Sequence, residues 1–172
     1  MKFLIVDDHE LLREGLAGVL RQFDAEAVVL HAADGERGLL QAQAHPDLAA
    51  VLVDLRMAGI GGLGAVAGLK RLLPGVPAIV LSSSEDPADV RRALAAGARG
   101  YCPKSASNQT LMAALRLVLA GEVYVPPLMA LEEPSTESQA SARGPAQRPG
   151  PASQAGRAAS LALGHGASPA QP

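Results

Sequence analysis

The sequence has very few aromatic residues and almost no cysteine. Its 172 residues include one cysteine, Cys102, no tryptophan, and only 2% aromatic residues. A single cysteine excludes an internal disulfide and is typical of a protein from a reducing compartment. Without tryptophan, the core of this 48% hydrophobic chain must be built from Leu, Val, Ile and Ala.

Long apolar runs and an excess of positive charge are also missing. No stretch approaches the ~20 apolar residues that a membrane-spanning helix needs. The apolar N-terminal run is ended by Asp7 and Asp8, too early for a signal peptide. The net charge of −2 argues against a strongly basic nucleic-acid-binding surface over the whole chain. We therefore expect a cytoplasmic protein with no membrane segment.

The composition changes near Leu131. Apolar runs recur regularly before this point, whereas Pro, Ser, Gln, Ala and Gly dominate after it. Such a segment has too little apolar surface to offset its chain entropy. We predict a folded domain over residues 1–122, a linker over 123–131 and a disordered tail over 132–172.

Within the first part, short apolar runs alternate with stretches of helical periodicity. The predicted strands are Lys2–Val6, Ala27–Leu30, Leu48–Val53, Ala78–Leu81 and Gly100–Cys102. The predicted helices are His9–Phe23, the stretch from the N-cap Asp34 to about Ala44, Leu63–Leu73, Pro87–Gly97 and Gln109–Ala120. Strict alternation of five strand–helix units predicts an α/β fold, a doubly wound parallel sheet with helices on both faces.

Polar residues stand where the predicted strands end. In a doubly wound sheet, active groups gather at the carboxyl ends of the strands. Acidic residues follow the first and third strands, hydroxyl groups follow the fourth, and a lysine follows the fifth. These residues are Asp7, Asp8, Asp54, Ser82, Ser83, Ser84 and Lys104. We expect them to converge on one edge of the sheet.

Their combined chemistry suits phosphoryl transfer. Clustered carboxylates attract a hard divalent cation, Mg²⁺ in particular, and a carboxylate can act as a nucleophile toward phosphorus. A cation, a lysine and a hydroxyl stabilise the charge on the transferred group. Each residue also has a simpler interpretation: the acid pair as a solvated turn, Ser82 as a helix cap, Lys104 as a solvated lysine. The ordered combination favours the functional interpretation.

These motifs resemble the receiver domain of two-component response regulators, over about residues 1–122. FLIVDDHELLREGL resembles the family's first strand and helix, and the run after the acid pair resembles the NarL/FixJ (LuxR-type) branch. VLVDLRMAGIGG resembles the phosphorylation-site segment, IVLSSSED the fourth strand with its switch hydroxyl, and ALAAGARGYCPKSAS the fifth-strand segment. The resemblance implies a flavodoxin-like fold with strand order 2-1-3-4-5.

The resemblance also implies a role for each residue at the strand ends. Asp54 would be phosphorylated by a sensor histidine kinase. Mg²⁺ would be bound by Asp8, Asp54 and the backbone carbonyl of Arg56, with Asp7 acting through water. Ser82 and Lys104 would contact the phosphoryl group, and Tyr101 would swing inward when Ser82 moves. The output and possible homodimer face would be the last two helices with the fourth and fifth strands.

Two positions depart from the usual family pattern. Ala58 stands where proline is usual, and Gly61 stands where aspartate is usual. We expect the loop that supplies the Arg56 carbonyl to be looser and the metal affinity to be reduced.

The tail is a larger departure. This branch normally continues into a helix-turn-helix domain, but residues after Leu131 show no two-helix apolar pattern. DNA binding by this chain is therefore doubtful, and a decayed or frameshifted output domain is one hypothesis.

Two other functions remain as alternatives. A pseudo-receiver would use the fold for protein interaction without phosphorylation, although it would be expected to lose some of the polar residues. A small aspartyl-phosphate phosphatase would need an acid two residues after the nucleophile, where this chain has Arg56. We expect a signalling domain that catalyses only its own phosphoryl transfer and dephosphorylation, rather than an enzyme with a separate substrate.

Overall fold

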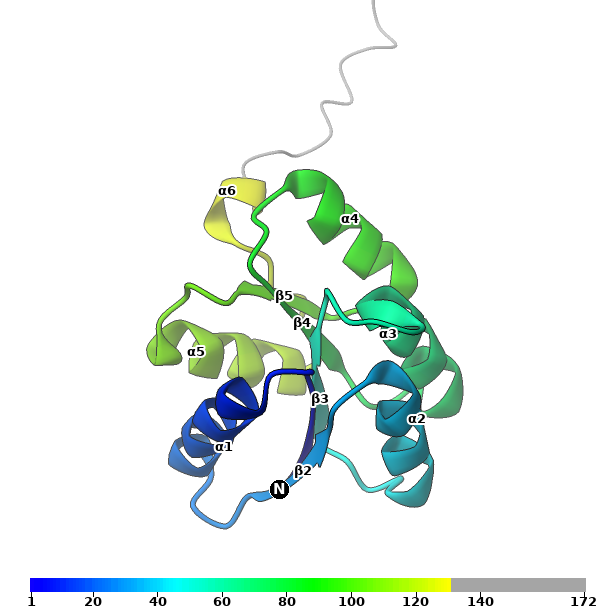
Figure 1. Cartoon of the computed structure of the whole chain (residues 1–172). Helices are drawn as coiled ribbons and strands as arrows, with labels where there is room; N and C mark the ends of the chain where they lie inside the picture. Colours follow the sequence, from blue (N-terminus) through cyan, green and yellow to red (C-terminus); the bar gives the residue numbers. More distant parts are fainter. Residues whose placement is uncertain (131–172) are drawn as a thin grey trace, which may run out of the picture. The chain divides into compact units, whose positions relative to one another are not determined.

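The computed structural model describes residues 1–130, in which five strands alternate with helices (Figure 1). The strands are β1 (Lys2–Val6), β2 (Val28–Ala32), β3 (Ala50–Asp54), β4 (Ala78–Ser82) and β5 (Gly100–Pro103). The helices are α1 (Glu10–Phe23), α2 (Gly35–Ala44), α3 (Gly61–Leu72), α4 (Pro87–Ala96), α5 (Asn108–Leu119) and the short α6 (Pro127–Ala130). None of the helices in this described part is long and apolar enough to cross a membrane. The predicted tail lies outside the described residues.

The five strands form one parallel sheet in the order β2-β1-β3-β4-β5. In the register of the central strands, Phe3 lies beside Ala50, and Val51 lies beside Ala78. Helices α1 and α5 cover one face of the sheet, and α2, α3 and α4 cover the other (Figure 1). The predicted doubly wound fold and strand order are confirmed.

Both faces of the sheet are apolar because both are covered. Side chains of a strand point alternately to its two faces. Phe3 and Ile5 of β1 accordingly pack with α1 and α5, whereas Leu4 and Val6 pack with the helices on the other face. Strands buried in this way lack polar alternation, which explains why the sequence shows continuous apolar runs.

Capping residues fix where the helices begin and end. The side chain of Asp34 accepts a hydrogen bond from the backbone N–H of Arg37 at the start of α2, as predicted. Pro87 occupies the first turn of α4, and Gly97 ends that helix in the left-handed conformation at φ +112°. Asp34 and Pro87 thus begin helices soon after the carboxyl ends of β2 and β4, whereas Gly97 leads into the start of β5.

Several predicted boundaries differ from the structure by one or two residues, and two of these differences have a clear physical cause. Strand β2 extends to Ala32 and includes His31, because the edge of the sheet is only partly covered and tolerates a polar side chain. Helix α3 begins at Gly61, two residues before the predicted start. Glycine has a low helix propensity, so the Gly61–Gly62 pair did not predict a helical first turn.

Residues 122–130, most of the predicted linker, contact the domain. Tyr124 forms an isolated parallel bridge with Gly100 on the outer side of β5. Its backbone N–H donates to Arg99 O at 2.9 Å, and its carbonyl accepts from the backbone N–H of Tyr101 at 2.9 Å. Val125 and Met129 pack against the core cluster beneath α4. The free edge of β5 is thus partly covered by the chain's own next segment.

Candidate functional site

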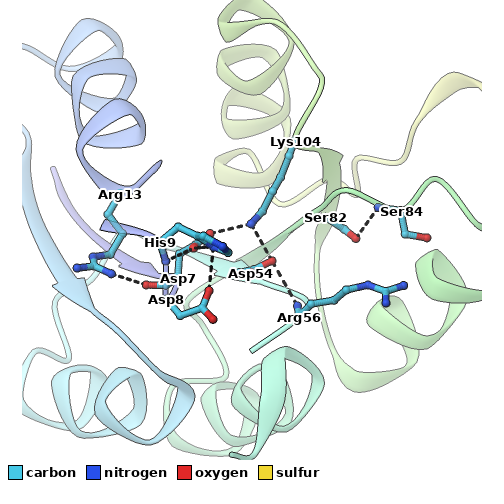
Figure 2. A network of polar contacts seen from close by, with 9 residues as sticks. All are labelled: Asp7, Asp8, His9, Arg13, Asp54, Arg56, Ser82, Ser84 and Lys104. Atoms are coloured by element: carbon cyan, nitrogen blue, oxygen red, sulfur yellow. Dashed lines mark hydrogen bonds and ion pairs between the residues drawn. The ribbon is translucent and has the colours of Figure 1, made fainter. Parts of the chain in front are cut away.

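Polar side chains from four strand ends meet at the carboxyl edge of the sheet (Figure 2). Asp7 directly follows β1, Asp54 is the last residue of β3, Ser82 is the last residue of β4, and Lys104 directly follows β5. Because the strands are parallel, their carboxyl ends lie at one edge of the sheet, and these side chains therefore lie near one another. Lys104 is in direct contact with both Asp7 and Asp54.

The acidic residues form a compact group with a histidine. One potential ligand atom from each of Asp7, Asp8, His9 and Asp54 lies within 4.8 Å of all the others. Asp7 is fully buried and Asp54 is 2% exposed, whereas Asp8 and His9 are exposed. His9 Nδ1 lies 3.0 Å from Asp7 Oδ1 and 2.9 Å from Asp8 Oδ1. The histidine therefore bridges the acid pair.

Lys104 links the two buried carboxylates. Its Nζ lies 3.0 Å from Asp7 Oδ2 and 3.1 Å from Asp54 Oδ1. Burial alone lowers the pKa of Lys104, but its hydrogen bonds to Asp7 and Asp54 outweigh burial, so the net pKa is raised. The lysine is therefore held as a cation against the carboxylate of Asp54.

Asp54 is held in an environment that resists ionisation. Burial raises its pKa most strongly, and the negative charge of Asp7 adds to this increase. The hydrogen bond from Lys104 lowers the pKa but does not compensate for burial. The contact with Asp7 and Asp54 therefore raises the pKa of Lys104. The pKa of Asp54 stays above its usual value, because burial raises it more than the contact with Lys104 lowers it.

Ser82 at the end of β4 and Tyr101 in β5 both contact the neighbouring β4–α4 connection. Ser82 Oγ accepts a hydrogen bond from the backbone N–H of Ser84 at 3.0 Å, and the Ser82 carbonyl accepts from the backbone N–H of Lys104 at 2.7 Å. The fully buried side chain of Tyr101 donates from its hydroxyl to Ser84 O at 2.7 Å. The Tyr101 ring therefore lies in an inward position, and its hydroxyl contacts the backbone of the segment that follows Ser82.

The loop after β3 folds closely over Asp54. The backbone N–H of Arg56 donates to Asp54 Oδ1 at 3.3 Å, and the N–H of Gly62 donates to Leu55 O at 3.2 Å. A Cβ atom at position 62 would lie 2.2 Å from Asp54 O, so only glycine fits there. The exposed side chain of Arg56 reaches Asp89 of α4, with Nη2 3.7 Å from Oδ2.

Sequence reasoning missed two residues of this network. His9 bridges the carboxylates, and Arg13 donates from Nη1 to the backbone carbonyl of Asp7 at 2.7 Å. A signal for both was present: His9 follows the acid pair directly, and Arg13 lies one helical turn later on the same face.

The donor set fits a divalent metal. Three carboxylates with closely spaced oxygens are the ligands that hard cations prefer. Lys104 contacts two of these carboxylates, and His9 Nδ1 contacts the adjacent acid pair, as Figure 2 shows. The acidic pocket has the chemistry for binding a metal ion.

Comparison with known proteins gives the family. The response regulator receiver domain family matches residues 3–116. The chain belongs to this family. Its acidic pocket and Lys104 lie within the matched region, so the receiver resemblance found in the sequence is confirmed.

Relatives with known names come from the same family. The chain is 37% identical over 144 residues to the response regulator GacA of Pseudomonas protegens, covering 80% of this chain and 67% of the relative. It is 35% identical over 122 residues to the response regulator UvrY of Escherichia coli O157:H7, covering 71% of this chain and 56% of that protein. It therefore spans between 56% and 67% of the length of these relatives.

Solved structures agree with the fold. A LuxR family response regulator from Aurantimonas sp. SI85-9A1 superposes with a TM-score of 0.71 at 28% identity, covering 76% of this chain and 93% of that one. The receiver domain of the putative response regulator NarL from Mycobacterium tuberculosis superposes with a TM-score of 0.64 at 30% identity, covering 70% and 97% respectively. The predicted NarL and LuxR-type relationship is confirmed.

Proposed function

We propose that this chain is a phospho-accepting receiver in a two-component system and that Asp54 takes the phosphoryl group from a sensor histidine kinase. The observation that carries the proposal is the contact of Lys104 with Asp54 beside the acid pair. A structural ion pair alone would not need two further carboxylates at the same edge. The family membership supports the same conclusion.

The proposed reaction is a phosphoryl transfer between the kinase and Asp54. A carboxylate oxygen of Asp54 forms a bond to phosphorus while the bond from phosphorus to the donor nitrogen, or to acetate in a small acyl phosphate, breaks. Lys104 is close enough to stabilise the oxygens of the transferred group. The hydroxyl of Ser82 would donate a hydrogen bond to one of these oxygens. The chain needs no separate substrate beyond its phosphodonor.

Mg²⁺ is the proposed cofactor. Asp8, Asp54 and the Arg56 carbonyl would hold it, with Asp7 acting through water. When bound, Mg²⁺ would neutralise charge on the phosphoryl oxygens. In this chain the three acids lie close to one another, and Lys104 and His9 hold the buried Asp7 in place.

The proposed output is a change on the face formed by α4, β5 and α5. Phosphorylation would draw Ser82 toward Asp54 and alter the contact between Tyr101 and Ser84. This face is the candidate surface for a homodimer. One relative is a transcriptional activator protein, ExaE of Pseudomonas putida, which suggests transcription regulation as the family context. A cytoplasmic location fits this role.

A mass measurement tests the acceptor. The full chain is incubated with Mg²⁺ and acetyl phosphate and then analysed by intact mass spectrometry. The wild type is expected to gain one phosphoryl group, and Asp54→Ala is expected to gain none. Asp47→Ala is the matched control, because this aspartate lies in an exposed loop and pairs with Lys2.

Labelling that persists in Asp54→Ala would move the acceptor to another residue. A wild type that takes no label while remaining folded would favour the pseudo-receiver alternative.

A further inference from the structure

The loop between β3 and α3 is weakly constrained by its own sequence. It contains Ala58 where the family usually has proline, and Gly59 and Gly61 adopt positive φ angles of +73° and +66°. Glycine restricts the backbone least and proline restricts it most. The same loop carries the Arg56 carbonyl, so something outside the loop must hold it in place.

Helix α2 makes that contact through Glu36 in its first turn. Glu36 Oε1 accepts a hydrogen bond from the backbone N–H of Ile60 at 3.1 Å. A Cβ atom at position 59 would lie 2.5 Å from Glu36 Oε1 and 2.8 Å from Oε2, so the carboxylate packs directly on Gly59. The glycine that loosens the loop is thus also the residue that admits the Glu36 carboxylate.

The side chain of Ile60 strengthens the same contact. A Cβ atom at position 35 would lie 2.7 Å from Ile60 Cγ1, so the missing side chain of Gly35 leaves room for Ile60 against α2. The start of the loop is held separately, since the N–H of Leu55 donates to Leu81 O at 2.9 Å. The loop is therefore fixed at its start by β4 and near its end by α2.

We propose that Glu36 is a positioning residue of the phosphoryl-acceptor site. Its carboxylate holds the backbone at Gly59 and Ile60, and through this backbone it keeps the Arg56 carbonyl where a metal ion can use it. Glu36 supplies from another helix the rigidity that proline at position 58 would give. This inference rests on the proposed function of the site.

The test measures Mg²⁺ affinity by NMR titration of the ¹⁵N-labelled full chain. Glu36→Ala is expected to weaken Mg²⁺ binding about fivefold, the size expected for the loss of one hydrogen bond of ordinary net strength at an exposed position. Glu36→Gln keeps an acceptor for the Ile60 N–H and is expected to stay within about twofold of the wild type. Phosphorylation of Glu36→Ala by acetyl phosphate should recover at saturating Mg²⁺, because no reacting group has been removed.

Restoring proline gives the second arm. Ala58→Pro in the Glu36→Ala background is expected to bring Mg²⁺ affinity back toward the wild-type value, while Ala58→Pro alone changes it little. Glu14→Ala, which removes an exposed carboxylate from α1, controls for the change in net charge. Circular dichroism confirms that each variant is folded.

The positioning role is refuted if Glu36→Ala binds Mg²⁺ like the wild type, if Glu36→Gln is as weak as Glu36→Ala, or if proline gives no rescue. Each of these outcomes leaves the proposed function intact. A wild type that binds no Mg²⁺ would overturn both proposals.

Discussion

At the scale of single residues, the acceptor site places two buried carboxylates against one lysine. Asp7 and Asp54 both contact Lys104, and burial and mutual repulsion raise the pKa of Asp54 despite this contact. A group held in an unfavourable charge state reduces stability. Burial of the reactive carboxylate therefore lowers the stability of the fold, which is common at functional sites.

Replacing Asp54 by asparagine is expected to stabilise the protein at neutral pH. The folded-state pKa of Asp54 is raised, so the folded state binds this proton more tightly than the unfolded state. Stability consequently falls as pH rises from the ordinary carboxyl pKa through the raised one, where the ionised carboxylate carries the cost of burial. Asp54→Asn removes that cost, and we expect a gain of about 1 kcal/mol, or roughly 4 °C in Tm.

The measurement is thermal unfolding in metal-free buffer at pH 7 and again at acidic pH. The gain should disappear below the ordinary carboxyl pKa, where Asp54 is protonated in both states. Asp47→Asn is the control, because the hydrogen bond from Lys2 lowers the pKa of Asp47 and its removal should not stabilise. A lower Tm for Asp54→Asn at pH 7 would show that the Lys104 contact outweighs burial.

At the scale of elements, the outer edge of β5 is the place where the domain meets its C-terminal segment. Tyr124 makes two backbone hydrogen bonds there, one with Arg99 just before the strand and one with Tyr101 in it. An exposed strand edge is a site for unwanted pairing, and a covered edge avoids it. The segment also contacts the backbone of the proposed switch tyrosine, so the state of Tyr101 and the position of residues 122–130 should be linked.

Tyr124→Pro is expected to detach this segment. Proline lacks the N–H that donates to Arg99 O, so the Arg99 carbonyl loses this hydrogen bond. We expect a loss of about 1–3 kcal/mol and faster hydrogen exchange in the peptide that covers residues 122–130. Tyr124→Phe keeps the backbone N–H and should exchange like the wild type. Unchanged exchange in the proline variant would mean that the hydrogen bond to Arg99 does not hold the segment.

At the scale of the whole molecule, residues 1–130 contain a complete receiver fold. The two core clusters of the described residues lie on opposite faces of one sheet, and each is closed by its own helices. The acidic pocket, Lys104 and the segment that covers β5 are also within this range.

A fragment of residues 1–130 is therefore expected to fold and to accept a phosphoryl group from acetyl phosphate. Its Tm should lie within about 2 °C of the full chain, because no described core contact is removed. A fragment of residues 1–121 is the matched comparison and should be less stable, since it lacks Tyr124, Val125 and Met129. A 1–130 fragment that fails to fold would assign the remaining residues a structural role.

The sequence by itself determined the fold and the residues that could react. Continuous apolar strands, helical periodicity and caps such as Asp34 are local signals, and the polar residues at the strand ends follow from the parallel topology. Local signals failed where the environment was not uniform. The polar His31 made β2 look shorter than it is, and the low helix propensity of Gly61 made α3 look as if it began later.

Only the tertiary structure decided which groups touch. The contact of Lys104 with Asp7 and Asp54 joins residues up to 97 positions apart, and the contact of Glu36 with Ile60 joins residues 24 positions apart. Such pairings depend on how helices and strands pack in three dimensions, and no periodicity along the chain encodes them. The sequence thus supplied the reactive groups, whereas packing set their distances, their burial and the support of the loop around Arg56.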